Sequence, residues 1–128
     1  IKLPSGRKLY YANPAIGVNR WNREALTYTG VDQTTRKWAV TETYGGRCVE
    51  NIVQAIARDC LAEAITRVEA AGYPVVFPVH DELVCEAPPD NPGESLNNII
   101  KQMVRLIPWA PGLVLGASGY ISKFFQKD

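Results

Sequence analysis

The sequence predicts an α+β fold in which an antiparallel sheet with a β-hairpin packs on a long amphipathic helix and a second, shorter helix. Three observations predict it: short runs rich in β-branched and aromatic residues near the start, a long helical pattern after Gly45-Gly46, and two short apolar runs behind that pattern. A length of 128 residues leaves room for one domain. We therefore expect a single partial domain over 1–128, with a strand-rich lead-in (1–46) and a helix–hairpin–helix–strand core (47–128).

The lead-in is expected to hold three short strands. Turn residues precede Leu9-Tyr10-Tyr11, which predicts the first strand. Residues 12–23 contain Asn-Pro and a glycine and are expected to be irregular. Residues 25–29 and 37–41 are rich in β-branched and aromatic side chains, and the polar stretch between them predicts an antiparallel pair.

The long helix is expected to run from Gly45-Gly46 to about Ala71, because Gly72-Tyr73-Pro74 ends it. Apolar side chains recur at helical spacing on one face: Val49, Ile52, Val53, Ile56, Cys60 and Ala64. The opposite face of the first three turns is polar and carries Arg47, Asn51, Gln54 and Arg58. Guanidinium and amide groups donate hydrogen bonds to phosphates and base edges, so this face is a candidate DNA-binding surface. An ordinary solvated helix face is the alternative.

The two apolar runs at 75–79 and 83–85 predict a β-hairpin with His80-Asp81-Glu82 at its tip. Tight hairpin turns favour Asn-Gly or Asp-Gly, so this tip has no advantage as a turn. Two adjacent carboxylates at a strand end are oxygen ligands suited to Mg²⁺, and the imidazole could donate to a phosphate or a hydroxyl. A polar surface turn is the alternative.

The last third is expected to contain a helix and a final strand. Asn91-Pro92-Gly93-Glu94 combines an Asn cap, Pro at the first helical position and Glu at the third. Pro108 and Pro111 end this helix, and residues 113–115 predict a strand before a polar tail.

Composition narrows the function classes. No apolar run approaches the ~20 residues that span a bilayer, and no signal segment opens the chain, so a cytoplasmic protein without membrane contact is expected. Three cysteines without CxxC spacing indicate reduced thiols. Residues 1–47 hold eight basic and three acidic side chains, whereas 48–100 hold two basic and nine acidic. This segregation fits polyanion contacts around a metal-binding centre, or a solvated surface with accidental grouping.

Two stretches of the chain resemble the last part of the palm in family A (DNA polymerase I-like) DNA polymerases. They are Tyr44–Asp59, reading YGGRCVENIVQAIARD, and Val79–Glu86, reading VHDELVCE. The phage and prophage branch is the nearest match. The resemblance extends through Leu3–Arg7 and the segment after Trp109, so it covers nearly the whole chain.

The resemblance implies a template-directed DNA polymerase that adds deoxynucleotides to a primer 3′ end by two-metal phosphoryl transfer. Asp81 matches the second catalytic aspartate, which helps to hold two Mg²⁺ ions, and Glu82 matches the accessory carboxylate beside it. His80 matches a residue that contacts the primer end. Gln54 matches a glutamine facing the minor groove of the template–primer, where A·T and G·C pairs show acceptors at similar places.

The chain departs from the family in two ways. Arg47, Asn51 and Gln54 are spaced Arg-x₃-Asn-x₂-Gln, whereas bacterial repair polymerases have Arg-x₃-Asn-x₃-Gln. The first catalytic aspartate and the nucleotide-binding fingers helix are absent from these 128 residues. The expected partners are therefore primer–template DNA, deoxynucleotides and the rest of the palm and fingers, in a bacterial or phage-infected cell. The isolated chain is expected to be inactive.

Two other function classes compete with this interpretation. A metal phosphohydrolase needs several histidine ligands, and His80 is the only histidine of the chain. A non-catalytic module that binds duplex nucleic acid, or a prophage remnant, remains the alternative.

Overall fold

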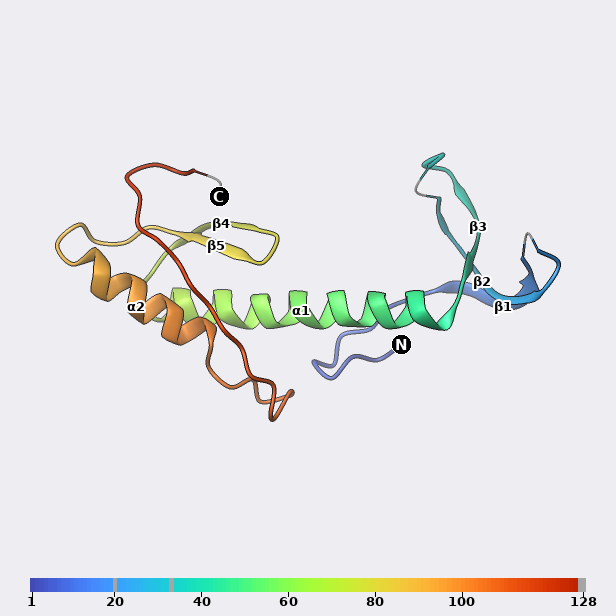
Figure 1. Cartoon of the computed structure of the whole chain (residues 1–128), viewed down its shortest axis with the longest axis horizontal. Helices are drawn as coiled ribbons and strands as arrows, with labels where there is room; N and C mark the ends of the chain where they lie inside the picture. The colour runs from blue at the N-terminus through green and yellow to red at the C-terminus, as the bar shows by residue number, and fades with distance from the viewer. Residues whose placement is uncertain (20, 33, 127–128) are drawn as a thin grey trace. The chain divides into compact units, whose positions relative to one another are not determined.

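The computed structural model describes residues 1–19, 21–32 and 34–126, and it confirms the α+β class. The chain divides into two compact units, Ile1–Ala55 and Ile56–Asp128. Figure 1 labels the elements in chain order: β1 (Ala12–Val18), β2 (Glu24–Val31), β3 (Trp38–Thr43), α1 (Gly45–Ala70), β4 (Val75–Val79), β5 (Glu82–Cys85) and α2 (Pro92–Met103).

The first unit contains a three-stranded antiparallel sheet in the order β1-β2-β3. β2 and β3 pair in one unbroken register from Leu26↔Thr43 to Val31↔Trp38, which confirms the predicted antiparallel pair. Leu3 and Ala55 are buried in this unit, and the Arg7 Nη2 donates to the carbonyl of Ala55 at 2.9 Å.

Two expectations for the lead-in are wrong. Residues 12–18 are not irregular but form β1, which pairs with β2 from Ala12↔Thr29 to Val18↔Glu24. A register shift between Ala12 and Ala15 accommodates the Asn-Pro pair, so lateral pairing overrides the local turn signal. Residues 9–11 form no strand, and only an isolated bridge between Lys2 and Lys8 is found there.

α1 begins and ends close to the predicted positions. Its end is closed by two backbone hydrogen bonds, from Gly72 to the Glu69 carbonyl at 2.9 Å and from Tyr73 to the Val68 carbonyl at 3.2 Å. Gly72 has φ +91°, the left-handed conformation in which glycine carries no steric penalty. This geometry is the physical reason that the Gly-Tyr-Pro sequence ends the helix.

In the second unit, the C-terminal part of α1 supplies the core. Val68 is completely buried, and Ala64 and Ile107 are nearly so. α2 starts as predicted, because the Asn91 side chain accepts a hydrogen bond from the backbone of Glu94 and Pro92 is the first helical residue. In Figure 1, the β4–β5 hairpin and α2 both lie beside this part of α1.

The predicted strand at 113–115 is wrong. From residue 104 to 126 the described chain contains no strand, because none of this segment pairs with another. Its tail contacts the unit through side chains instead, with the Phe125 ring edge-on to Phe77 at 5.1 Å. Among the described residues, no helix is both long and apolar enough to cross a membrane.

Candidate catalytic hairpin and nucleic-acid interface

The tip of the β4–β5 hairpin is a two-residue loop. Val79 pairs with Glu82, which leaves His80 and Asp81 as the loop. His80 has φ +53°, while Asp81 does not have a positive φ. A positive φ at the first loop residue alone is the pattern of a type II′ turn, which strongly favours glycine there. A side chain in this conformation costs on the order of 1–3 kcal/mol.

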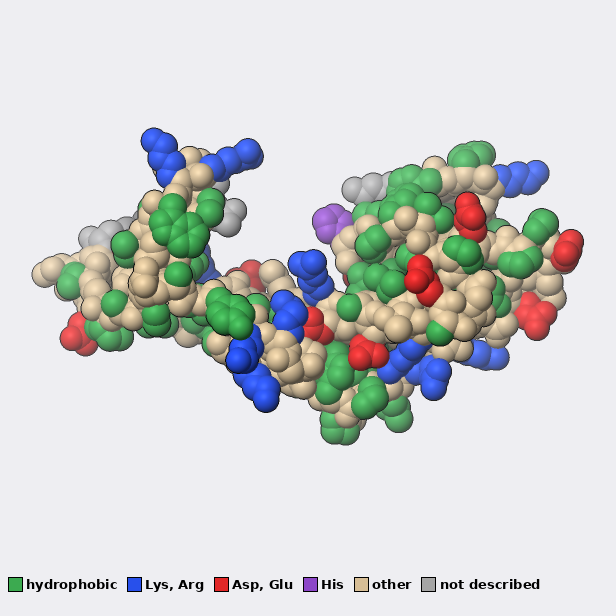
Figure 2. All heavy atoms as spheres, turned by 180° about the vertical axis from the view of Figure 1, so that it is seen from behind, with side chains coloured by type: hydrophobic (Ala, Val, Ile, Leu, Met, Phe, Trp, Pro, Cys, Tyr) green, Lys and Arg blue, Asp and Glu red, His purple; other side chains and the backbone are tan. Residues whose placement is uncertain are grey.

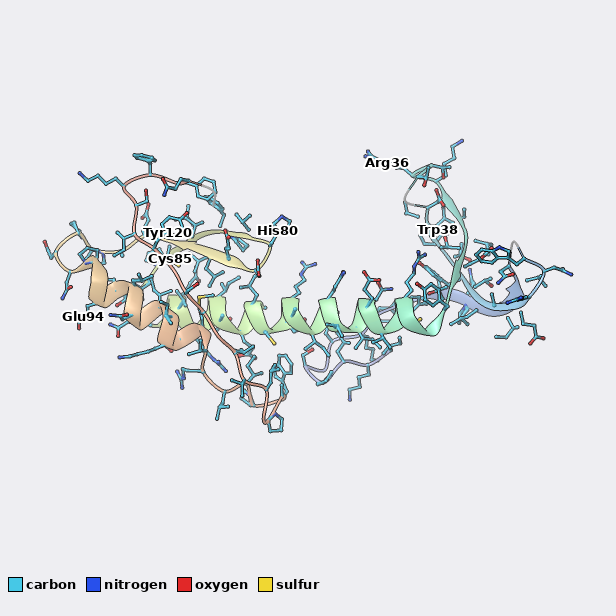
Figure 3. The ribbon with its side chains drawn as sticks, in the orientation of Figure 1. Arg36, Trp38, His80, Cys85, Glu94 and Tyr120 are labelled. Carbon is cyan, nitrogen blue, oxygen red and sulfur yellow. The ribbon has the colours of Figure 1, made fainter. Side chains whose placement is uncertain are left out.

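The three polar side chains of the tip are exposed and available to a ligand. His80, Asp81 and Glu82 are all solvent-accessible. Within the described part of the chain, none of them makes a side-chain hydrogen bond or ion pair. Figure 3 shows His80 at the end of the hairpin, remote from Cys85 and Tyr120 at the other end. Two carboxylates and an imidazole therefore lie at consecutive positions of the hairpin tip, without a side-chain partner among the described residues.

The other end of the hairpin is held in place by its own unit. The backbone of Glu86 donates to the Pro74 carbonyl at 3.0 Å, which closes the strand pair. Cys85 is half-buried, and burial, followed by the nearby Glu69 carboxylate, raises the pKa of its thiol. The Phe77 ring contacts Phe125 of the tail. The end of the hairpin opposite the exposed tip is therefore fixed by contacts within its own unit.

The donor set of the tip suits Mg²⁺ but supplies only part of a site. Carboxylate oxygens are the ligands that Mg²⁺ prefers, and Asp81 and Glu82 offer them at adjacent positions of the chain. Among the described residues, no group of three or more His, Cys, Asp or Glu side chains is placed to hold a metal ion. Octahedral coordination at this tip would therefore need water, phosphate or further oxygen ligands.

Three of the four predicted DNA-binding side chains on α1 are exposed: Arg47, Gln54 and Arg58. The Gln54 Nε2 donates to Glu50 Oε1 at 3.3 Å, one helical turn away. The Arg47 guanidinium lies over the Tyr44 ring, 5.8 Å from its centre. Both contacts are at the surface, so these groups remain within reach of a ligand.

Asn51 differs in burial from the other three residues of the polar face of α1. It is half-buried, and its Nδ2 donates to the Tyr11 hydroxyl at 3.0 Å. The Tyr11 ring is in turn edge-on to Tyr28, with 5.0 Å between ring centres. The Asn51 amide therefore connects α1 to the first unit's aromatic cluster. Sequence reasoning missed this contact because Tyr11 is 40 positions away.

The apolar face of α1 is only partly buried. Val49 is 58% exposed and Val53 is similarly exposed, although both belong to the predicted apolar face. The buried positions of α1 are Ala55, Asp59, Ala64 and Val68, of which Ala64 belongs to the predicted apolar face. The covered side of the helix therefore coincides only in part with the apolar face that the sequence indicates.

The predicted site residues are distributed over both units. The structure brings His80, Asp81 and Glu82 together at one turn, and Arg58 belongs to the same unit. Arg47, Asn51 and Gln54 belong to the first unit.

Comparison with known proteins gives an informative relative. The chain is 45% identical to the DNA polymerase of Bacillus phage SP02 over 129 aligned positions. The alignment covers all of this chain and 19% of the relative, so the chain spans about a fifth of the length of that polymerase. No family model matches the chain. No solved structure matches it. The sequence is thus similar, from end to end, to a portion of a phage DNA polymerase.

Proposed function

We propose that this chain is part of a template-directed DNA polymerase of family A and provides the carboxylate-bearing hairpin of its palm. The observation that carries the proposal is the 45% identity with a phage DNA polymerase along the entire chain. The exposed tip with His80 at positive φ supports it, because strained residues concentrate at functional sites. The reaction would be the addition of deoxynucleotides to a primer 3′ end.

In this proposal, Asp81 and Glu82 would hold Mg²⁺. The ion would neutralise developing charge on the phosphates and orient the reacting oxygens when it is bound. The His80 imidazole is exposed beside these carboxylates and can donate a hydrogen bond to the primer end. These three residues would position the reacting groups, since phosphoryl transfer depends mainly on placement and charge stabilisation.

The polar side chains of α1 would contact the primer–template. Arg47 and Arg58 are exposed cations that suit backbone phosphates, and Gln54 can donate to the acceptors that all base pairs show in the minor groove. Asn51 would need to leave the Tyr11 hydroxyl to make such a contact. We therefore assign the direct DNA contact first to Gln54, Arg47 and Arg58.

The test is Asp81→Asn in the complete polypeptide that carries this chain. Loss of one negative charge from the metal site is expected to lower primer extension by a factor on the order of 10³, while duplex binding stays within about twofold. Asp90→Asn is the matched control, because Asp90 is an exposed carboxylate in the turn before α2.

The control variant is expected to extend a primer as the wild type does. Unchanged primer extension by Asp81→Asn would contradict the proposal and favour a non-catalytic module that binds duplex nucleic acid. The measurement is the single-turnover rate on a labelled primer–template with Mg²⁺ and deoxynucleotides.

A further inference from the structure

In the loop between β2 and β3, one carboxylate accepts several hydrogen bonds from the described residues. Asp32 Oδ1 accepts hydrogen bonds from the backbone of Thr34 at 3.0 Å, from the backbone of Thr35 at 2.7 Å and from the Thr35 hydroxyl at 2.9 Å. Backbone bonds from Arg36 to Asp32 and from Asp32 to Lys37, both 2.8 Å, close the loop. The hydrogen bond from the Thr35 backbone is the main reason that the pKa of Asp32 is lowered.

This loop presents two cations beside an exposed indole. Arg36 has φ +56°, and both Arg36 and Lys37 are exposed. Trp38, the first residue of β3, is 66% exposed. Figure 2 shows basic side chains at the end of the β2–β3 hairpin with apolar side chains directly below them. Figure 3 places Arg36 at the end of the hairpin and Trp38 next to it on β3.

The indole does not stand alone on its face of the sheet. Val31 pairs directly with Trp38, and Val40 lies on the same face because strand side chains alternate. Val40 is 72% exposed. An exposed aromatic ring on an apolar strip, bordered by cations, is the chemistry that binds a charged polymer with flat apolar units.

The excess of basic residues in the first part of the chain indicates the charge of the polymer. The first 47 residues hold eight basic and three acidic side chains. The Asp32 carboxylate accepts hydrogen bonds from Thr34 and Thr35, and Glu42 lies toward the other end of β3. A polyanion is therefore favoured over a basic or apolar protein surface, and the exposed Trp38 ring favours one that carries flat bases.

We propose that this loop binds single-stranded DNA, with Trp38 stacked on an unpaired base and Arg36 and Lys37 on the adjoining phosphates. A single strand is required because the faces of bases inside a duplex are already covered by their neighbours. The contact uses neither the carboxylates of the β4–β5 hairpin nor the polar side chains of α1, so it goes beyond the function proposed above.

The test measures binding of 5′-fluorescein-labelled dT₁₂ to the 128-residue chain by fluorescence anisotropy, without Mg²⁺ or nucleotide. A micromolar dissociation constant is expected at low salt. Trp38→Ala is expected to weaken binding about tenfold, and Trp38→Phe is expected to retain most of it, since one stacked base is lost only in the first variant.

Trp21→Ala is the matched control. Trp21 is 63% exposed in the same unit, but it lies in the β1–β2 turn at the other end of β2. Its replacement is expected to leave dT₁₂ binding within about twofold of the wild type. Equal losses in Trp21→Ala and Trp38→Ala would overturn the proposal.

A second variant keeps the test independent of how well Trp38→Ala folds. Arg36→Gln combined with Lys37→Gln is expected to lower the slope of log Kd against log salt by roughly 1.4, because each phosphate contact on a single strand contributes about 0.7. An unchanged slope, or a blunt 12-base-pair duplex that binds as tightly as dT₁₂, would overturn the proposal. Since the readout omits metal and nucleotide, these outcomes are distinct from failure of the Asp81→Asn experiment.

Discussion

At His80, the residue type that suits the backbone conformation differs from the one that the proposed function requires. Its φ of +53° places an imidazole side chain where glycine is preferred. The side chain forms no hydrogen bond within the described part of the chain that would repay this strain. A ligand that contacts the imidazole would provide the compensating interaction in the working protein.

We expect His80→Gly to stabilise the chain and to impair its function. Removal of the side chain relieves the strain, so the free energy of unfolding is expected to rise by about 1 kcal/mol. Primer extension by the complete polypeptide is expected to fall, because the imidazole is lost from the tip. Urea denaturation of the chain and single-turnover extension measure the two effects.

Gly72→Ala is the control, for which the expected change in the free energy of unfolding has the opposite sign. Gly72 also has a positive φ, +91°, but it already carries the preferred residue. Its replacement is expected to lower the free energy of unfolding by about 1 kcal/mol. A loss of stability in both variants would show that the backbone at His80 is not strained.

At the scale of elements, α1 is joined to the segment after α2 by two side chains. Arg67 Nη1 donates to the Arg105 carbonyl at 3.0 Å, and its Nη2 donates to the Leu106 carbonyl at 3.1 Å. Trp109 Nε1 donates to Glu63 Oε1 at 3.3 Å, and Glu63 forms an ion pair with Arg67 at 3.6 Å. These bonds satisfy carbonyls beyond the end of α2 that no helix turn can reach.

Arg67→Met is expected to lower the free energy of unfolding by about 1–2 kcal/mol, because two charge-assisted hydrogen bonds are lost while the aliphatic stem is retained. Urea denaturation followed by far-UV circular dichroism measures the change. Lys101→Met is the matched control, since Lys101 is an exposed cation on α2. If the two substitutions lowered the free energy of unfolding equally, the loss would come from removal of surface charge and not from the two hydrogen bonds of Arg67.

The elements that sequence reasoning placed correctly carry strong local signals. The Asn91 cap with Pro92 fixes the start of α2, and Gly72 fixes the end of α1. The errors at 12–18 and 113–115 concern strands, which depend on a partner elsewhere in the chain. Local composition could not predict that the first segment finds β2 and that the second finds no partner among the described strands.

At the scale of the whole molecule, the proposed metal site rests on two carboxylates. Asp81 and Glu82 leave most of the coordination of Mg²⁺ to other ligands, and the ion releases its waters reluctantly. We therefore expect the purified 128-residue chain to extend no primer at millimolar Mg²⁺ with all four deoxynucleotides. The measurement is gel analysis of a labelled primer–template. Extension that Asp81→Ala abolishes would contradict this expectation.

The sequence by itself determined the class of fold, the two helices, the hairpin and the triplet at its tip, because each depends on residues close together in the chain. The resemblance carried by residues 44–59 and 79–86 pointed to a DNA polymerase, and similarity to a phage polymerase runs through the chain. Only the tertiary structure decided that Asn51 bonds to Tyr11, that Val49 stays exposed and that β1 exists. These features depend on contacts between distant segments, whose free energy no local pattern contains.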